Sequence, residues 1–193
     1  MHSHTLSSSI RSLHKRERER TPVQFAEYLI SKTRYLFGSQ RSLIAALWCA
    51  PDSYYFQYDN VIVYDETRNA HTYDGPYPII AHPPCGPWGK LRYFSDEDCE
   101  HGLKAMELVH RWGGVVEQPK GSQLFVQYGR GGAIEEVNQG DYGHRARKPT
   151  LLYWYVPPRI THWVDQVHLE PVPKRHFIET WISGRPSYLG SPS

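Results

Sequence analysis

Two short apolar runs, separated by a long amphipathic segment, constrain the fold more than any other feature of the sequence. Residues 78–81 (Pro-Ile-Ile-Ala) and 115–117 (Val-Val-Glu) are predicted to be buried β-strands. Between them, apolar residues recur at helical spacing until the glycine pair 113–114, so we predict a helix that begins near Ser95. A strand–helix–strand unit requires a sheet that is at least partly parallel. The sequence therefore predicts an α/β fold.

Further elements are predicted around this unit. A helix is expected over residues 21–38, with Thr21 as its N-cap. Residues 61–64 and 149–156 are rich in β-branched or aromatic side chains and are predicted to be strands. The apolar run 42–50 fits either a strand or a buried helix.

Length and composition limit the class of protein. The chain has 193 residues, of which 39% are hydrophobic and 13% aromatic, which is enough for one core and excludes a disordered protein. We expect residues 1–20 to form a basic, partly disordered arm and residues 21–193 a single α/β domain. No apolar run is long enough to cross a membrane, and no signal peptide is evident. The three cysteines cannot all pair with one another. These features predict a cytoplasmic protein with reduced thiols, and the net charge of +2 does not by itself predict nucleic-acid binding.

Two reactive side chains are predicted to meet at one edge of the sheet. Cys85 follows the first of the two strands, and Glu117 ends the second. Ligands of open parallel sheets bind beyond the carboxyl ends of the strands, so a thiol and a carboxylate would face one cleft. Pro83 and Pro84 fix the backbone that enters Cys85, and the following helix or Arg92 would favour the thiolate. A buried structural cysteine is the alternative.

These residues resemble the motifs of DNA cytosine-5 methyltransferases. Residues 82–85 (His-Pro-Pro-Cys) are similar to the Pro-Cys nucleophile motif of that family, and residues 115–121 (Val-Val-Glu-Gln-Pro-Lys-Gly) to its Glu-Asn-Val segment. Residues 141–148 (Asp-Tyr-Gly-His-Arg-Ala-Arg-Lys) resemble its Tyr-Gly … Gln-x-Arg-x-Arg stretch, and the three segments occur in the order of the family. Residues 82–92 and 143–150 are also similar to small phage and prophage proteins described as methyltransferase-like.

The resemblance implies a fold, a reaction and a setting. The fold would be a reduced Rossmann-like methyltransferase fold with a mostly parallel sheet flanked by helices. Cys85 would attack C6 of a cytosine flipped out of DNA, and Glu117 would bind the N3 edge and the exocyclic amine. Arg147, or Arg145, would contact the pyrimidine O2. The setting would be the cytoplasm of a bacterial host cell, with phage DNA modification or restriction–modification as the context.

The resemblance also implies S-adenosylmethionine as the methyl donor. Pro83 and Pro84 would lie beside it, and Asp65 or Glu66, after the strand 61–64, would supply the acid that binds its ribose. The glycine motif that the family uses for this cofactor, Phe-x-Gly-x-Gly, is absent before Cys85.

Other functions stay open beside this one. Without the glycine motif, the chain fits a non-catalytic methyltransferase-like phage protein that binds DNA, a nucleotide or a host defence protein. A Pro-Pro-Cys motif also occurs in thymidylate synthase, so a nucleotide-level pyrimidine C5-modifying enzyme is another possibility. Residues 18–29 resemble a segment at the C-terminal end of the related phage proteins, which would make this chain circularly permuted.

Aromatic and metal-ligating side chains near Cys85 allow two further hypotheses. Trp88, Tyr93 and Phe94 could stack on a base, although packing in the core or at its rim is the simpler explanation for each. Zinc is not favoured and no metal is predicted, because two of its four candidate ligands are only two residues apart in the proposed helix and point to different faces. The four candidates are Cys85, Cys99, His101 and His110.

Overall fold

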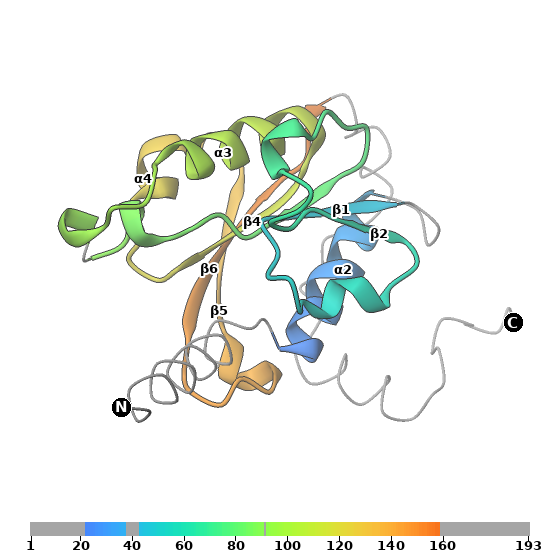
Figure 1. Ribbon diagram of the computed structural model, residues 1–193, viewed down its shortest axis with the longest axis horizontal. Helices are drawn as coiled ribbons and strands as arrows, with labels where there is room; N and C mark the ends of the chain where they lie inside the picture. Colours follow the sequence, from blue (N-terminus) through green and yellow to red (C-terminus); the bar gives the residue numbers. More distant parts are fainter. Residues whose placement is uncertain (1–21, 38–42, 91, 159–193) are drawn as a thin grey trace, which may run out of the picture.

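A six-stranded mixed sheet organises the structure (Figure 1). The computed structural model describes residues 22–37, 43–90 and 92–158. The strands lie in the order β2-β1-β3-β4-β6-β5; the first four in this order pair in parallel, and β6 is antiparallel to both β4 and β5. Five strands of this sheet therefore point the same way, and the α/β, mostly parallel prediction is confirmed. The strands are β1 (Ile44–Leu47), β2 (Val61–Val63), β3 (Ile79–Ala81), β4 (Gly114–Pro119), β5 (Ala133–Asn138) and β6 (Pro149–Tyr155).

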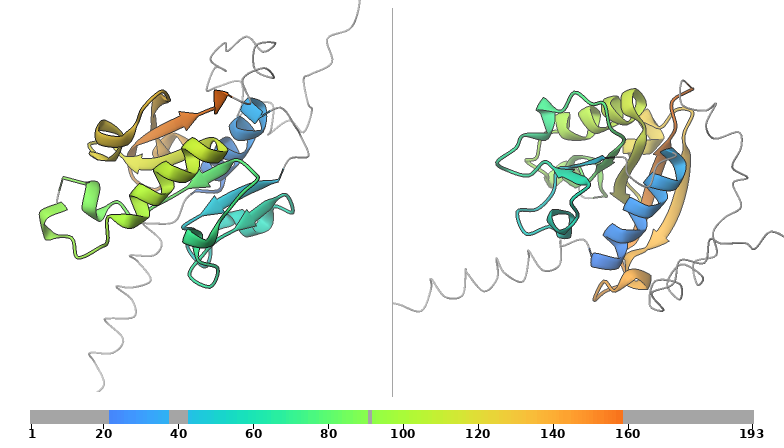
Figure 2. Two further views of the ribbon diagram at one scale, coloured as in Figure 1. Left: turned by 90° about the horizontal axis from the view of Figure 1, so that it is seen from above. Right: turned by 90° about the vertical axis from the view of Figure 1, so that its right-hand side faces the viewer.

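Helices cover both faces of this sheet (Figures 1 and 2). Side chains of alternate strand residues enter two cores: Ile44 and Ala46 pack with α2 (Val23–Phe37), whereas Ala45 and Leu47 pack on the opposite face, with α3 (Glu100–Trp112) and α4 (Leu124–Tyr128). This arrangement of a mixed sheet flanked by helices is compatible with a Rossmann-like fold. Short 3-10 helices fill the connections: η1 (Tyr54–Gln57), η2 (Ala70–Thr72), η3 (Gly86–Trp88), η4 (Arg92–Phe94) and η5 (Gln139–Tyr142).

The predicted strand–helix–strand unit is present as β3, α3 and β4. The helix begins at Glu100, however, and not near Ser95. Local hydrogen bonds explain the later start: Ser95 Oγ accepts from the Glu97 amide (3.2 Å), and Asp98 Oδ1 accepts from the Glu100 amide (2.8 Å). The Asp98 side chain therefore binds the first amide of the helix instead of lying in its first turn.

Two other strands complete the comparison with the sequence. The ambiguous run 42–50 contains a strand, β1, whose four residues are all buried. The edge strand β5 was not predicted because half of its residues are exposed and the strand carries no apolar pattern. The predicted basic arm, its neighbour Thr21 and the chain after residue 158 lie outside the described residues. Among the described helices, none is long and apolar enough to cross a membrane.

Candidate functional site

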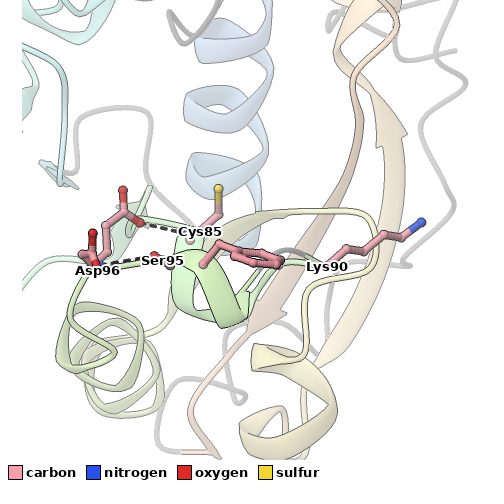
Figure 3. Close-up of a pocket in the computed structure, with 8 residues that line it drawn as sticks. Cys85, Lys90, Ser95 and Asp96 are labelled. Atoms are coloured by element: carbon pink, nitrogen blue, oxygen red, sulfur yellow. Dashed lines mark hydrogen bonds between the residues drawn. The ribbon is translucent and has the colours of Figure 1, made fainter.

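The predicted thiol and carboxylate lie at the carboxyl ends of two adjacent parallel strands. Cys85 follows β3 and is exposed, whereas Glu117 lies in β4 and is only 9% exposed. The β3–β4 register pairs Ala81 with Val116, which places His82 beside Glu117. An open cavity of about 720 Å³ begins at Cys85 and is further lined by Gly86, Gly89, Lys90, Phe94, Ser95, Asp96 and Glu97 (Figure 3).

The loop that carries Cys85 is anchored at both ends. Before the cysteine, Gln118 of β4 donates from Nε2 to the Pro83 carbonyl (2.9 Å). After it, the Gly86 amide donates to Glu97 Oε2 (3.0 Å). Ser95 and Asp96 lie on one side of Cys85, and Lys90 extends away on the other (Figure 3). The thiol thus has a defined position between an acidic and a basic side of the cavity.

Glu117 is the centre of a buried polar network. Its Oε2 lies 2.9 Å from His82 Nδ1, and its Oε1 accepts from Gln139 Nε2 at 2.9 Å. Lys148 Nζ lies 3.9 Å from the same Oε1. Both carboxylate oxygens therefore have partners, one from the residue after β3 and two from the segment between β5 and β6. Such a carboxylate has a fixed orientation.

The network continues from His82 and Gln139 into the core. The Tyr55 hydroxyl is 3.0 Å from His82 Nε2, and the Tyr55 side chain is fully buried. With Glu117 ionised, His82 Nδ1 is the donor to the carboxylate, and Nε2 accepts from the Tyr55 hydroxyl. Gln139 Nε2 also donates to Thr150 Oγ1 (3.1 Å), whereas Gln139 Oε1 has no hydrogen-bond partner among the described residues although Gln139 is fully buried.

These contacts explain the ionisation of Glu117. Burial by itself raises the pKa of this carboxyl, but the hydrogen bond from His82, the charge of Lys148 and the bond from Gln139 together lower it below its usual value. Glu117 is therefore an anion at neutral pH, and it accepts hydrogen bonds instead of donating a proton.

The thiol of Cys85 is not activated in the way that the sequence predicts. Burial and the carboxylates of Glu97 and Glu117 raise its pKa, and the charge of Lys148 only partly offsets them. The positive charge of Arg92, which was expected to favour the thiolate, is not among the causes of this pKa shift. The N-terminus of α3 does not directly follow Cys85 in the sequence either, since that helix begins at Glu100. Cys85 is thus mostly a thiol in the free protein.

The cation beside Glu117 is Lys148, which the sequence analysis did not single out. Arg145 and Arg147, the predicted contacts for a pyrimidine O2, are exposed in the connection between η5 and β6. Lys148 is held because its amide donates to Asn138 Oδ1 (3.0 Å) at the end of β5. His82 and Gln139 were missed as well; the only signal for His82 is its place beside Pro83 in the quoted motif.

The residues predicted to bind S-adenosylmethionine are not among those that line the cavity at Cys85. Asp65 Oδ1 accepts from the Thr67 amide, the Thr67 hydroxyl and the Arg68 amide at 2.7–3.0 Å, so this oxygen closes a local turn; Glu66 is exposed. Directly after β1, Trp48 packs edge-on against His71. A bulky indole at this position does not fit the close approach of a cofactor that glycine permits.

The histidines and cysteines of the disfavoured zinc hypothesis lie in separate environments. His101 Nδ1 is 2.7 Å from His71 Nε2 and accepts from Trp48 Nε1 (3.2 Å), whereas His110 Nε2 is 2.9 Å from the Tyr153 hydroxyl. Within the described ranges, no three His, Cys, Asp or Glu side chains are placed to hold one metal ion. Of the candidate stacking residues, Trp88 is buried and packs against α3, while Tyr93 and Phe94 are exposed.

No protein-family model matches the chain, and a search of the curated proteins finds no match. Chemically, the site combines an accessible nucleophile with an oriented anion and a nearby cation. Of these three residues, only Cys85 is among those that line the cavity. A thiolate can add to an electron-poor ring carbon, and an anion with a nearby cation can hydrogen-bond the edge of a flat polar ring.

Proposed function

We propose that this protein is a DNA cytosine-5 methyltransferase-like enzyme in which Cys85 adds to C6 of a cytosine. The observation that carries the proposal is the placement of Cys85 and Glu117 at one edge of the sheet, on neighbouring parallel strands, with Lys148 acting on both. The order of the three motifs along the chain gives independent support. The proposed fold class is a reduced Rossmann-like methyltransferase fold.

The proposed reaction begins with the Cys85 thiolate. Its Sγ forms a bond to C6, the C5=C6 electron pair shifts, and C5 becomes nucleophilic. The thiol proton of Cys85 passes to water, and N3 takes up a proton from water as the ring is attacked. The ionised Glu117 accepts hydrogen bonds from the exocyclic amine and from this N3–H, while Lys148, or Arg147 or Arg145, faces the charge that develops on O2. After C5 has bonded to an electrophilic carbon, whose former bonding pair leaves with the donor, the C5 and N3 protons pass to water and the S–C6 bond breaks, which restores the ring.

The methyl donor implied by the resemblance is S-adenosylmethionine, and calorimetry with this compound tests it directly. Trp48 and the turn at Asp65 do not match the site that the family uses for this cofactor. The steps proposed for Cys85, Glu117 and Lys148 are therefore written without it. We also propose that the chain is circularly permuted. In support, α2 contains residues 23–29 of the segment 18–29, which resembles the C-terminal end of the related phage proteins, and α2 packs against the central strands β3 and β4.

Two observations favour a second function. The raised pKa of Cys85 and the Trp48 contacts are the features of a scaffold that binds DNA, a nucleotide or a host protein without chemistry. Its ligand would meet the same exposed cavity. This non-catalytic protein is the alternative that the experiment must separate.

The test is mass spectrometry of nucleosides from DNA and from nucleotide pools of cells that produce the protein. Wild type is expected to generate a new cytosine mass, and Cys85→Ala is expected to abolish it. Cys99→Ala is the matched control, because this second cysteine is also exposed but lies outside the cavity. Identical profiles for wild type and Cys85→Ala, with both proteins folded, would contradict the enzyme and favour the binding function.

A further inference from the structure

Tyr93 and Phe94, which we call the aromatic ridge, lie beside the cavity at Cys85. Their side chains are 80% and 85% exposed, and Phe94 lines the cavity together with Cys85. Nearby Trp88 is buried, so its ring serves packing and leaves these two rings facing solvent. Adjacent exposed aromatic rings at the rim of a cavity are typical of a binding surface.

Two cations accompany the aromatic ridge. The guanidinium of Arg92 lies 4.5 Å from the centroid of the Tyr93 ring and donates from Nη2 to the Tyr93 hydroxyl (2.8 Å). Lys90 lines the cavity and extends away from Asp96, which lies on the other side of Cys85 (Figure 3). Flat rings with neighbouring cations suit a chain of bases joined by phosphates, and the phosphates would follow the side of Lys90.

We infer that the aromatic ridge binds single-stranded nucleic acid, with one pyrimidine in the cavity and its neighbours stacked on Tyr93 and Phe94. This inference rests on the proposed function for the role of Cys85, and it specifies a polymer substrate over a free nucleotide. A free nucleotide needs only the cavity, whereas two outward rings and two cations provide contacts for adjoining nucleotides. In a duplex the bases stack on one another and offer no free face to the ridge.

The experiment measures binding of a fluorescein-labelled 12-nucleotide single strand that contains cytosines, by fluorescence anisotropy with the full chain. Tyr93→Ala and Phe94→Ala are each expected to weaken binding by about fivefold or more, as removal of a stacking ring does, and Phe94→Trp to retain it. Lys90→Gln should reduce the slope of log K against log salt by about 0.7. Ile134→Ala is the control, because Ile134 is 55% exposed on the edge strand β5.

Because both ridge side chains are exposed, their alanine variants are expected to keep the wild-type melting temperature. Equal affinities of wild type and both alanine variants would overturn the inference, as would competition by deoxycytidine monophosphate or by duplex DNA as strong as that by the unlabelled strand. Failure of this binding inference can be distinguished from failure of the proposed reaction. Ridge-dependent binding without a new cytosine mass would refute only the chemistry, and a new mass with ridge-independent binding would refute only this inference.

Discussion

Replacement of Glu117 by Gln is expected to destabilise the protein in a way that depends on pH. The carboxylate accepts two charge-assisted hydrogen bonds, from His82 and from Gln139, at 2.9 Å each. Each such bond contributes about 1.5–3 kcal/mol, whereas the amide of Glu117→Gln keeps one neutral bond worth about 1 kcal/mol and turns an N–H toward a donor. The expected loss in the free energy of unfolding at pH 7 is therefore about 2–5 kcal/mol.

The sign of the pH dependence follows from the ionisation of Glu117. Its pKa in the folded protein is below the ordinary value of 4.5, so the folded state binds the proton less readily than the unfolded state. The advantage of wild type is complete above the ordinary pKa and is lost as the pH falls through the lower pKa of the folded protein. Wild type should lose stability in that range, whereas Glu117→Gln should change less.

Thermal unfolding followed by circular dichroism measures both effects. For a chain of this size, about 2–5 kcal/mol corresponds to a decrease in Tm of about 4–20 °C at pH 7. The control is Glu136→Gln, whose carboxylate pairs with Lys120 at 2.6 Å but is about half exposed, so a change below about 1 kcal/mol is expected. Equal Tm values for wild type and Glu117→Gln at pH 7, or a difference that persists in acid, would refute the reasoning.

Three further predictions concern the thiol and the sheet. Glu97→Gln lowers the pKa of Cys85, so alkylation by iodoacetamide at pH 7.5 should accelerate; an unchanged rate would refute this cause. Lys148→Gln raises that pKa and should slow alkylation, whereas Lys148→Arg should restore the wild-type rate, and equal rates would contradict the role of the charge. Gly114→Ala places a Cβ against the Ile79 carbonyl oxygen at φ +120°, which should cost about 2–5 kcal/mol in urea unfolding. An unchanged midpoint of urea unfolding for Gly114→Ala would contradict this expectation.

The strands and the reactive pair were predictable because their signals are local. The runs around β3 and β4 are apolar and short, and the helix between them has a regular period, so their parallel pairing follows from the chain itself. Because β3 and β4 pair in parallel, Cys85 and Glu117 lie at the same edge of the sheet. The predicted start of α3 was wrong because the hydrogen bonds of Ser95 and Asp98 compete with the helix. The sequence does not reveal whether these local bonds or the first helical turn will form.

The partners of Glu117 could not be predicted because they come from other strands and loops. His82 reaches the carboxylate only through the β3–β4 register, and Gln139 does so because β5 and β6 fold back beside β4. The Lys148 backbone is held because its amide donates to Asn138 Oδ1 and its carbonyl accepts from the Gln139 amide and the Thr150 hydroxyl. A sequence motif rich in arginine therefore pointed to Arg145 and Arg147, while the structure brings the adjacent lysine to the carboxylate.

Hydrogen exchange at C5 of cytosine tests the central claim most directly, since addition of the Cys85 thiolate to C6 makes C5 basic without any methyl donor. The protein is incubated with a cytosine-containing single strand, and separately with deoxycytidine monophosphate, in D₂O, and the mass of cytosine is measured over time. We predict a gain of one deuterium at C5, faster as the pH rises because the pKa of Cys85 is raised, and no gain with Cys85→Ala. Folded wild-type protein that produces no deuterium gain on either substrate, or a gain that persists in Cys85→Ala, would contradict the account.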